Sequence, residues 1–298
     1  MQLTRKKMDK KIVFAGTVRN CEKGLHKAFK TLEKISVLFD EFQFIFIESD
    51  SNDKTLEILE HYQRKIPNVM IVSLGSLLHN LPLRTHRIAY CRNKFLEIIE
   101  SSHKLRAFDY LGVFDMDGIN NLLTPESVFS CFEYDNWDVM TANQLIKYYD
   151  IWALRHPQWC PGDCWSEINT CKDIFGHIAS EKLFIKIRQI FISKKTAPIE
   201  VESAFGGFAL YKINSILGCR YSGVNDNEEV CEHIEFHRQI RANGGRIYIN
   251  PQLINSYGNT PYDSWTDLIR LRTLTYLIKS EFIDFLKKAG GKKQGLKI

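Results

Sequence analysis

The sequence predicts an α/β fold with a mostly parallel sheet, and three observations lead to this prediction. Short apolar segments of strand length alternate with segments whose apolar residues recur every three or four positions. The connections between the apolar segments are long enough for the helical crossovers that parallel strands need. The 298 residues are 44% hydrophobic and 25% charged, a globular composition that excludes disordered, collagen-like and disulfide-scaffold proteins.

The first half of the chain alternates strand and helix without interruption. Residues 11–16 have the composition of a first strand, and the apolar residues from Leu25 to Phe39 then follow at helical spacing. The same order continues with a strand at 42–48, a helix around Leu56, Leu59 and Tyr62, a strand at 69–74, a helix at 88–99 and a strand at 110–114. This order indicates a parallel sheet with helices on both faces.

The second half is less regular. Strands are expected at 137–142, 204–211 and 245–250 and a helix at 228–242, whereas residues 144–198 are rich in aromatic side chains and have no clean periodicity. We therefore expect the second half to build a pocket over the regular first half. The last segment, residues 264–288, has the spacing of one or two basic amphipathic helices.

The sharpest functional signal is a pair of aspartates directly after the fourth strand. Asp115 and Asp117 flank Met116 and precede Gly118. Two carboxylates at the carboxyl end of a parallel strand can reach one divalent cation, and that cation can bridge the oxygens of a diphosphate. The pattern is short, and the alternative interpretation is an acidic turn that only ends the strand.

Further charged residues lie at the ends of neighbouring elements. Glu48, Asp50 and Asp53 follow the second strand and could accept hydrogen bonds from a ribose or a base, although Asp53 could also cap the next helix. Three arginines near the start of the third helix could neutralise a diphosphate or could form a solvated basic face. They are Arg84, Arg87 and Arg92.

Taken in order, these segments resemble the GT-A glycosyltransferases. VFAGTVRN (13–20) is similar to their nucleotide-entry strand, FIESDSNDKT (46–55) to their acidic segment and RTHRIAYCRN (84–93) to the helix before their paired aspartates. CEHIEFHRQIRANGGRIYINP (231–251) has the spacing of a segment of family 2. Gly206 and Gly207 resemble the Gly-Gly strand near the acceptor site, and residues 148–155 resemble the cryptococcal capsule-type mannosyltransferase group.

The resemblance implies a GT-A (Rossmann-like) fold and a metal-dependent transfer of a sugar from a UDP- or GDP-sugar to a hydroxyl of a glycan or a lipid-linked glycan. It implies Mn²⁺ or Mg²⁺ at Asp115 and Asp117. It also implies a nucleotide-sugar-binding half (1–118), an acceptor-binding and catalytic half (119–262) and a basic helical tail (263–298). The expected donor-binding residues are Thr17, Arg19, Glu48, Asp50, Asp53, Arg84, Arg87, Arg92, Asp115, Met116 and Asp117. The expected acceptor-binding residues are Asp150, Trp152, Arg155, Trp165, Gly206 and Gly207.

The catalytic base is the point where this sequence departs from the pattern of family 2. Glu232 and His233 stand where that family has Glu-Asp, so both are candidates for the base. The nearby Glu228, Glu229 and Glu235 are alternatives. An enzyme that retains the configuration of the sugar would need no such base, and His233 would then be a binding residue.

Two other function classes share some of these features. A sugar nucleotidyltransferase would have the same sheet and acidic site, but it is expected to carry a Gly-rich basic loop after the first strand, and GTVRNCEKG has only two glycines. A non-catalytic glycan-binding protein would have no use for the paired aspartates.

The segment between residues 152 and 177 permits two further interpretations. Its histidines and cysteines could form a zinc site, but their spacings fit no standard zinc pattern. They are His156, Cys160, Cys164, Cys171 and His177. The three tryptophans, Trp152, Trp159 and Trp165, could stack on a sugar or form a small core cluster.

The net charge of +5 lies near the C-terminus, where residues 268–298 hold eight basic and two acidic residues. A nearly neutral body with a basic tail favours an anionic membrane or a charged polymer, and not nucleic acid, as the partner. No segment approaches the run of about 18 apolar residues that spans a bilayer. The eight cysteines form no CxxC pair, so we expect a reduced, cytoplasmic protein. The basic tail leads us to expect peripheral contact at the inner membrane face as well.

Overall fold

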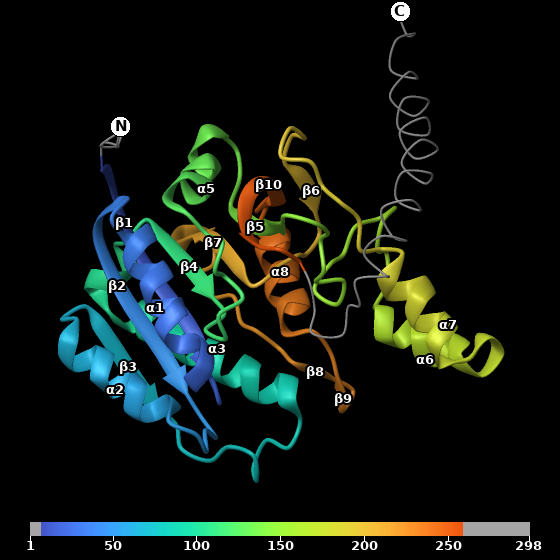
Figure 1. Ribbon diagram of the computed structural model, residues 1–298, viewed down its shortest axis with the longest axis horizontal. Coiled ribbons are helices and arrows are strands. Elements are labelled where there is room, and N and C mark those ends of the chain that lie inside the picture. Colours follow the sequence, from blue (N-terminus) through green and yellow to red (C-terminus); the bar gives the residue numbers. More distant parts are fainter. Residues whose placement is uncertain (1–6, 259–298) are drawn as a thin grey trace, which may run out of the picture. The chain divides into compact units, whose positions relative to one another are not determined.

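The computed structural model describes residues 7–258, and strands and helices alternate along this part of the chain (Figure 1). Eight strands form the main sheet. They are β1 (Met8–Val18), β2 (Phe39–Glu48), β3 (Val69–Ser73), β4 (Tyr110–Phe114), β5 (Val139–Gln144), β6 (Ile199–Val201), β7 (Phe208–Lys212) and β10 (Ile247–Ser256). A second, two-stranded sheet joins β8 (Val224–Asn225) to β9 (Glu228–Glu229).

The helices differ widely in length. They are α1 (Glu22–Ser36), α2 (Thr55–Lys65), α3 (Arg84–Ser101), α4 (His103–Arg106), α5 (Pro125–Phe129), α6 (Cys164–Phe175), α7 (His177–Glu181) and α8 (Glu232–Ala242). Short 3₁₀ segments cover Ser130–Glu133 and Ile213–Ser215, and a π-helical turn covers Lys182–Lys186.

The order of strands in the main sheet is β3-β2-β1-β4-β7-β5-β10-β6. The pairs β1–β2, β2–β3, β1–β4 and β5–β10 are parallel. Strand β7 runs antiparallel between β4 and β5, and β6 is antiparallel to β10 at the edge. The predicted α/β fold with a mostly parallel sheet is therefore confirmed.

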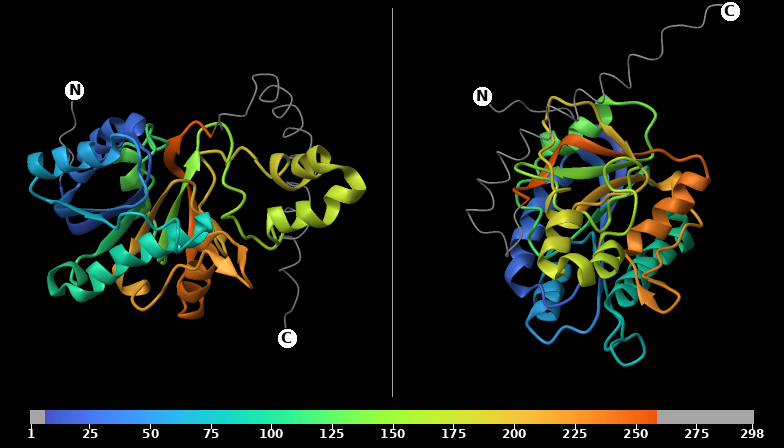
Figure 2. Two further views of the ribbon diagram at one scale, coloured as in Figure 1. Left: turned by 90° about the horizontal axis from the view of Figure 1, so that it is seen from below. Right: turned by 90° about the vertical axis from the view of Figure 1, so that its right-hand side faces the viewer.

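The sheet separates two apolar cores, and β1 contributes to both because its side chains alternate between the two faces. Ile12 and Phe14 pack in the core that holds α1, whereas Val13 and Ala15 pack in the core that holds α3. The right-hand view of Figure 2 shows α1 on one side of the sheet and α3 with α8 on the other. Burial on both faces explains why the strand KIVFAG reads as a continuous apolar run.

Several predicted boundaries differ from those of the structure. The strand expected at 204–211 begins only at Phe208, because Gly206 and Gly207 have φ values of 74° and 90°. The helix expected at 228–242 begins at Glu232, since residues 228–229 pair as β9. The aperiodic segment 144–198 contains α6, whose first turn is capped by the Asp163 side chain.

Three further expectations concern the C-terminal helices, membrane-spanning segments and disulfides. The predicted helices at 264–288 lie outside the described residues. Within residues 7–258, no helix is both long and apolar enough to cross a bilayer. All eight cysteines fall in the described part, and none of them forms a disulfide.

The carboxyl ends of β1 and β4 meet the N-terminal turn of α1 in a close contact. An added Cβ at Gly24 would lie 2.2 Å from the carbonyl oxygen of Asp117. The backbone of α1 therefore presses against the turn that follows β4, and a glycine is required for this approach.

We predict that Gly24→Ala lowers the free energy of unfolding by about 1–3 kcal/mol, because the new methyl group meets backbone atoms that cannot rotate away. Denaturant unfolding measures this change. Lys23→Ala is the matched control, since Lys23 is exposed in the same helical turn. Equal stabilities for the two variants would show that the turn after β4 does not depend on this contact.

Candidate active site

A cavity of about 440 Å³ opens at the carboxyl ends of β1 and β4. The start of α3, the loop at residues 149–153 and the start of α8 complete its walls. This is the edge where ligands bind in open α/β sheets. The first half of the chain provides one wall and the irregular second half provides the other.

Many of the residues that the sequence analysis selected line this cavity. They are Thr17, Arg19, Arg84, Arg87, Arg92, Asp115, Met116, Asp117, Asp150, Trp152, Glu232 and His233. Other selected residues do not line it. They are Glu48, Asp50, Asp53, Arg155, Trp165, Gly206 and Gly207. The roles of both groups stay predictions.

Arg92 lies at the centre of the site and touches polar groups from two other segments of the chain. Its Nη1 lies 2.7 Å from His233 Nε2. Its Nη2 lies 3.4 Å from Asp115 Oδ1 and 3.4 Å from Glu232 Oε1. One guanidinium therefore links α3 to the paired aspartates after β4 and to the first turn of α8.

Two aromatic rings enclose the same guanidinium. The carbon at the centre of the Arg92 guanidinium lies 4.8 Å from the centroid of Phe205 and 5.4 Å from that of Tyr221. The Arg92 side chain is only 5% exposed. Because a buried charge needs partners, Arg92 and its acidic neighbours depend on one another.

His233 is held in its neutral form. A guanidinium nitrogen can only donate a hydrogen bond, so His233 Nε2 is the acceptor from Arg92. Burial and the nearby charge of Arg92 keep the pKa of His233 well below its usual value. The ring also stacks on Phe205 with centroids 4.0 Å apart. The imidazole lone pair is thus occupied by Arg92.

The paired aspartates have different surroundings. Asp117 is exposed at the rim, and its Oδ1 accepts a hydrogen bond from the backbone N–H of Ile119 at 3.0 Å. Asp115 lies deeper, and burial raises its pKa to about 7. The charges of Asp117, Glu232 and Asp150 also raise the pKa of Asp115, whereas Arg92 lowers it. Asp115 therefore lies among three other carboxylates, and Arg92 pairs with Asp115 and with Glu232.

The arginines at the start of α3 are not equivalent. Arg87 is buried, and its Nη1 donates to the carbonyl oxygens of Leu81 and Pro82 at 2.6 and 2.7 Å. It therefore fastens the loop that precedes α3. Arg84 and Arg19 are exposed and line the mouth of the cavity, where they can face an anionic ligand.

The acidic residues after β2 fix loops beside the cavity. Glu48 is buried and accepts a hydrogen bond from Ser73 Oγ at 2.5 Å. Asp50 Oδ1 accepts from the backbone N–H of Leu77 at 2.9 Å, and Asp53 Oδ1 accepts from the first residue of α2 at 2.9 Å. These contacts agree with the capping alternative for Asp53.

In the wall that the second half of the chain provides, the Asp150 carboxylate is held by a backbone N–H group. Its Oδ2 accepts a hydrogen bond from the N–H of Gly206 at 2.9 Å. Gly206 cannot be replaced easily, because an added Cβ would lie 2.8 Å from Gln144 Nε2 and the φ angle is positive. Gly206 therefore does not line the cavity itself but holds the Asp150 carboxylate, which does.

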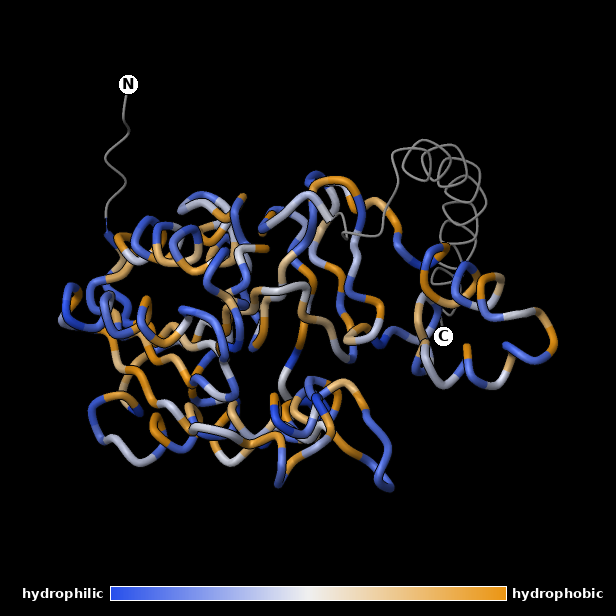
Figure 3. Tube along the Cα trace, turned by 60° about the horizontal axis from the view of Figure 1, so that its bottom comes forward, coloured by the Kyte–Doolittle hydropathy of each residue, from blue (hydrophilic) through white to orange (hydrophobic). Residues whose placement is uncertain are grey.

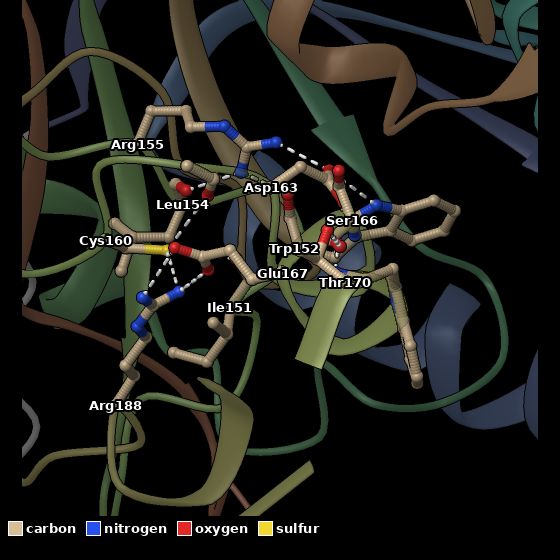
Figure 4. Close-up of polar contacts among 12 residues, drawn as sticks. Ile151, Trp152, Leu154, Arg155, Cys160, Asp163, Ser166, Glu167, Thr170 and Arg188 are labelled. Atoms are coloured by element: carbon tan, nitrogen blue, oxygen red, sulfur yellow. Dashed lines mark hydrogen bonds and ion pairs between the residues drawn. The ribbon is translucent and has the colours of Figure 1, made fainter. Parts of the chain in front are cut away.

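Trp152 and Arg155 belong to a polar network beside the cavity (Figure 4). Trp152 Nε1 and Arg155 Nη2 both donate to Asp163 Oδ2, at 3.1 and 2.7 Å. The other carboxylate oxygen of Asp163 caps α6 through the N–H of Trp165 at 3.0 Å. The side chain of Trp152 therefore reaches the cavity in an orientation that Asp163 fixes.

Tyr149 and Tyr221 are among the residues of the site that escaped the sequence analysis. Tyr149 lines the cavity, and burial together with the charges of Asp150 and Asp115 raises its pKa, so the phenol stays a donor. Tyr221 covers Arg92 from a loop between β7 and α8. The adjacent Asp150 could have indicated Tyr149, whereas no sequence signal marks Tyr221.

The zinc alternative gains no support from the geometry. Among residues 7–258, no three histidine, cysteine or acidic side chains gather as a metal-ligand group. Cys160 lies instead beside Arg188, with Nη1 and Sγ 3.6 Å apart. The same holds at the paired aspartates, since within the described residues no third histidine, cysteine or acidic side chain joins Asp115 and Asp117 in such a group.

A second buried histidine lies one helical turn after His233. His237 has no exposed surface, and its ring nitrogens contact Ser203 Oγ at 2.9 Å and Tyr211 OH at 3.0 Å. Burial, with a smaller effect of the charge on Arg92, lowers the pKa of His237 to about 3. His237 therefore stays neutral in the folded protein over most of the acidic range.

The comparison with known proteins identifies the fold. No family model and no curated protein matches the chain. The mannosyltransferase PcManGT from Pyrobaculum calidifontis, solved in complex with GDP-Man and Mn²⁺, is similar over 86% of this chain, with a TM-score of 0.50 and 9% identity. This similarity confirms the predicted GT-A fold.

Two other solved structures are more distant in shape. S. aureus TarS in complex with UDP-GlcNAc matches 90% of the chain, with a TM-score of 0.48 and 15% identity. Glucosyl-3-phosphoglycerate synthase from Mycobacterium tuberculosis, with Mn²⁺ and UDP, matches 78%, with a TM-score of 0.40 and 11% identity. The chain covers 59% of PcManGT, 66% of TarS and 64% of the synthase, which is less than two thirds of each.

We predict that Arg92→Ala lowers the free energy of unfolding by about 3–5 kcal/mol, because it leaves buried carboxylates without their cation. Arg238→Ala is the matched control: Arg238 pairs with Glu235 on the same protein, but its side chain is 66% exposed. That variant should change stability by less than about 1 kcal/mol. Similar effects of the two changes in denaturant unfolding would contradict the central role of Arg92.

We also predict that stability falls as the pH drops from about 6.5 towards 3, in part because the unfolded chain protonates His237 and the folded chain does not. In His237→Gln the dependence should weaken by about 1.4 kcal/mol per pH unit in this range. Chemical unfolding at several pH values measures the slopes. Parallel slopes for wild type and variant would refute the neutral, buried state of His237.

Proposed function

We propose that the protein is a glycosyltransferase that moves a sugar from a UDP- or GDP-sugar to a hydroxyl of a glycan or glycolipid acceptor, with the help of a divalent cation. The observation that carries the proposal is the placement of Asp115 and Asp117 in the cavity at the carboxyl edge of a GT-A sheet. PcManGT, which shares this fold, was solved with GDP-Man and Mn²⁺.

Asp115 and Asp117 are the residues that would hold the cation. They offer carboxylate oxygens, the ligands that Mg²⁺ and Mn²⁺ prefer. Burial and three neighbouring carboxylates raise the pKa of Asp115 to about 7 even though Arg92 lies beside it, so a further cation would favour its ionised form. A bound divalent cation would neutralise the diphosphate as it leaves the sugar. Water and diphosphate oxygens would complete its shell.

The donor diphosphate would face the mouth of the cavity. Arg19 and Arg84 are exposed there and can bind phosphate oxygens. Arg92 is different, because Asp115, Glu232 and His233 already occupy its guanidinium. We infer that Arg92 positions the carboxylates and that the rim arginines contact the donor. Thr17 and Met116 line the same wall.

The acceptor would approach from the second half of the chain. Asp150, Trp152 and the phenol of Tyr149 line this side of the cavity. An indole face packs well on the CH surface of a sugar, and a carboxylate and a phenol can bind its hydroxyls. This arrangement supports a carbohydrate acceptor and leaves its identity to experiment.

Glu232 is the better candidate for the base that deprotonates the acceptor. Glu232 and His233 both line the cavity at the first turn of α8. Arg92 occupies the one lone pair of the neutral His233 ring, whereas it contacts Glu232 at Oε1 and a carboxylate has a second basic oxygen. Two of the other candidates have partners elsewhere: Glu229 accepts from Thr85 N at 2.9 Å, and Glu235 pairs with Arg238. Glu228 is exposed in β9 and does not line the cavity. We infer that His233 orients Arg92 and that Glu232 takes the proton.

Release of the leaving group distinguishes the proposal from its two rivals. Each UDP- and GDP-sugar is incubated with the protein and manganese, with and without glycan acceptors, and the products are separated. A transferase releases free nucleoside diphosphate. A nucleotidyltransferase forms or cleaves pyrophosphate, and a binding protein releases neither, so either of these results would replace the proposal.

We predict that Asp117→Asn abolishes the manganese-dependent release of nucleoside diphosphate and leaves the melting temperature of the free protein unchanged within about 2 °C. The side chain is exposed and makes one local hydrogen bond, so the fold does not depend on its charge. Asp226→Asn, an exposed change in the β8–β9 hairpin, serves as the control. Normal turnover in a folded Asp117→Asn protein would exclude the metal assignment.

We further predict that Glu232→Gln lowers kcat by roughly 100-fold or more with little change in donor affinity. His233→Gln can still accept a hydrogen bond from Arg92, so it should keep most of the rate. The two variants are compared in single-turnover transfer assays. A larger loss in the His233 variant would reverse the two roles, and normal rates in both would indicate a retaining mechanism.

A further inference from the structure

The β8–β9 hairpin, from the second half of the chain, contacts the start of α3, which borders the cavity. Glu229 Oε1 accepts a hydrogen bond from the backbone N–H of Thr85 at 2.9 Å, across 144 positions of the sequence. Residues 225–229 are all polar, and Figure 3 shows the turn of the hairpin as a hydrophilic segment at the lower edge of the view. A surface hairpin therefore reaches the backbone of a helix that carries residues of the site.

The first turn of α3 has no cap from its own part of the chain. The residue before the helix is Leu83, whose side chain makes no capping hydrogen bond, and the first turn contains no acidic residue. The free N–H groups at a helix N-terminus favour a carboxylate. Glu229 supplies this carboxylate, and the hydrogen bond from the Thr85 N–H lowers the pKa of Glu229. The cap of α3 thus comes from the hairpin.

A close backbone contact fastens the hairpin at a second point. An added Cβ at Gly223 would lie 2.0 Å from the carbonyl oxygen of Thr85 and 2.7 Å from the backbone nitrogen of His86. The buried Thr85 hydroxyl lies 2.5 Å from the carbonyl oxygen of Gly223 and 3.1 Å from Glu229 Oε1, so it can donate to either oxygen. Both the backbone and the side chain of Thr85 are therefore held by the hairpin.

Arg84 comes directly before Thr85 and is the first residue of α3. Its side chain is exposed and lines the mouth of the cavity. Because the hairpin holds the backbone of Thr85, it also holds the point from which the Arg84 guanidinium extends. On the other side, Arg87 fastens the loop before α3 through the carbonyl oxygens of Leu81 and Pro82. The backbone at Arg84 is thus fixed from both directions.

We propose that Glu229 is a positioning residue: by capping α3 it holds Arg84 where the guanidinium can bind the diphosphate of the donor. The inference rests on the proposed glycosyl transfer and names a residue outside the cavity on which donor binding depends. Glu229 does not line the cavity. Its removal should therefore weaken donor binding only through Arg84.

The test is a double-mutant cycle on nucleotide binding. UDP and GDP are titrated with manganese into the wild type, Glu229→Ala, Arg84→Ala and the double variant, and binding is followed by calorimetry. Each single variant should bind the nucleotide about tenfold more weakly than the wild type. The double variant should bind as Arg84→Ala does, because Glu229 acts only through Arg84.

Two further variants separate positioning from a general loss of structure. Glu229→Gln keeps an oxygen that can accept from the Thr85 N–H, so it should regain most of the lost affinity. Glu228→Ala is the matched control, since Glu228 is an exposed glutamate of the same strand and does not line the cavity. It should bind the nucleotide as the wild type does. Melting temperatures of all variants show whether each one is folded.

Several results would overturn the inference. Unchanged affinity in Glu229→Ala would do so, and an equal further loss on adding Glu229→Ala to Arg84→Ala would show that the effect does not pass through Arg84. Stronger binding by both Glu229→Ala and Glu229→Gln would show that the carboxylate opposes the diphosphate by its charge. A lower kcat for nucleoside-diphosphate release at unchanged affinity would assign the role of the hairpin to α8, which begins with Glu232 shortly after it.

The same titrations separate a failure of this inference from a failure of the proposed function. A wild type that binds neither nucleotide would refute the proposed function and the positioning role together. A wild type that binds one nucleotide, with a Glu229→Ala variant that binds it equally well, would refute the positioning role alone.

Discussion

The buried guanidinium of Arg92 is the constraint on which the site depends. It is enclosed by Phe205 and Tyr221, and it connects Asp115 on one side to Glu232 and His233 on the other. These groups come from α3, from the turn after β4 and from α8, so their relative positions are fixed by one cation. Without the charge of Arg92, the carboxylates of Asp115 and Asp117 would repel each other and their acidic neighbours. Loss of Arg92 would therefore be expected both to change the shape of the cavity and to lower the stability of the domain.

The charges of the site are the physical basis of the proposed binding of a diphosphate with a cation. The charges of Asp117, Asp150 and Glu232 act on Asp115, and the buried Arg92 pairs with Asp115 and Glu232. A diphosphate alone would add negative charge to this corner, whereas a diphosphate with a divalent cation would offset it. The exposed arginines at the mouth then meet the outer phosphate oxygens.

Much of the fold could be predicted from the sequence. The parts that could not be predicted depend on contacts between residues far apart in the chain or on backbone angles. The regular strands and helices of the first half follow from periodicity, and the paired aspartates follow from their place after an apolar strand. The antiparallel insertion of β7 between β4 and β5 depends on contacts far apart in the chain, which no local pattern records. Gly206 and Gly207 have the spacing of a strand, but their positive φ values exclude it.

The roles of individual charged residues were the least predictable part. Arg87 and Arg92 read alike as arginines before a phosphate site, yet one donates to backbone carbonyls and the other to buried carboxylates and a histidine. His233 occupies the position of a base but accepts a hydrogen bond there. Burial and partner choice decide these roles, and both arise only after the second half of the chain has folded over the first. Helix α6 escaped because it buries only two of its residues.

The measurement that most directly tests this account is the equilibrium binding of UDP and of GDP, followed by calorimetry in the presence of manganese and again in the presence of a chelator. The account predicts that one of the two nucleotides binds, and that manganese strengthens its binding at least about tenfold, since the carboxylates of Asp115 and Asp117 then hold a cation against the diphosphate. Binding of the same strength with and without manganese, or no binding of either nucleotide, would contradict it.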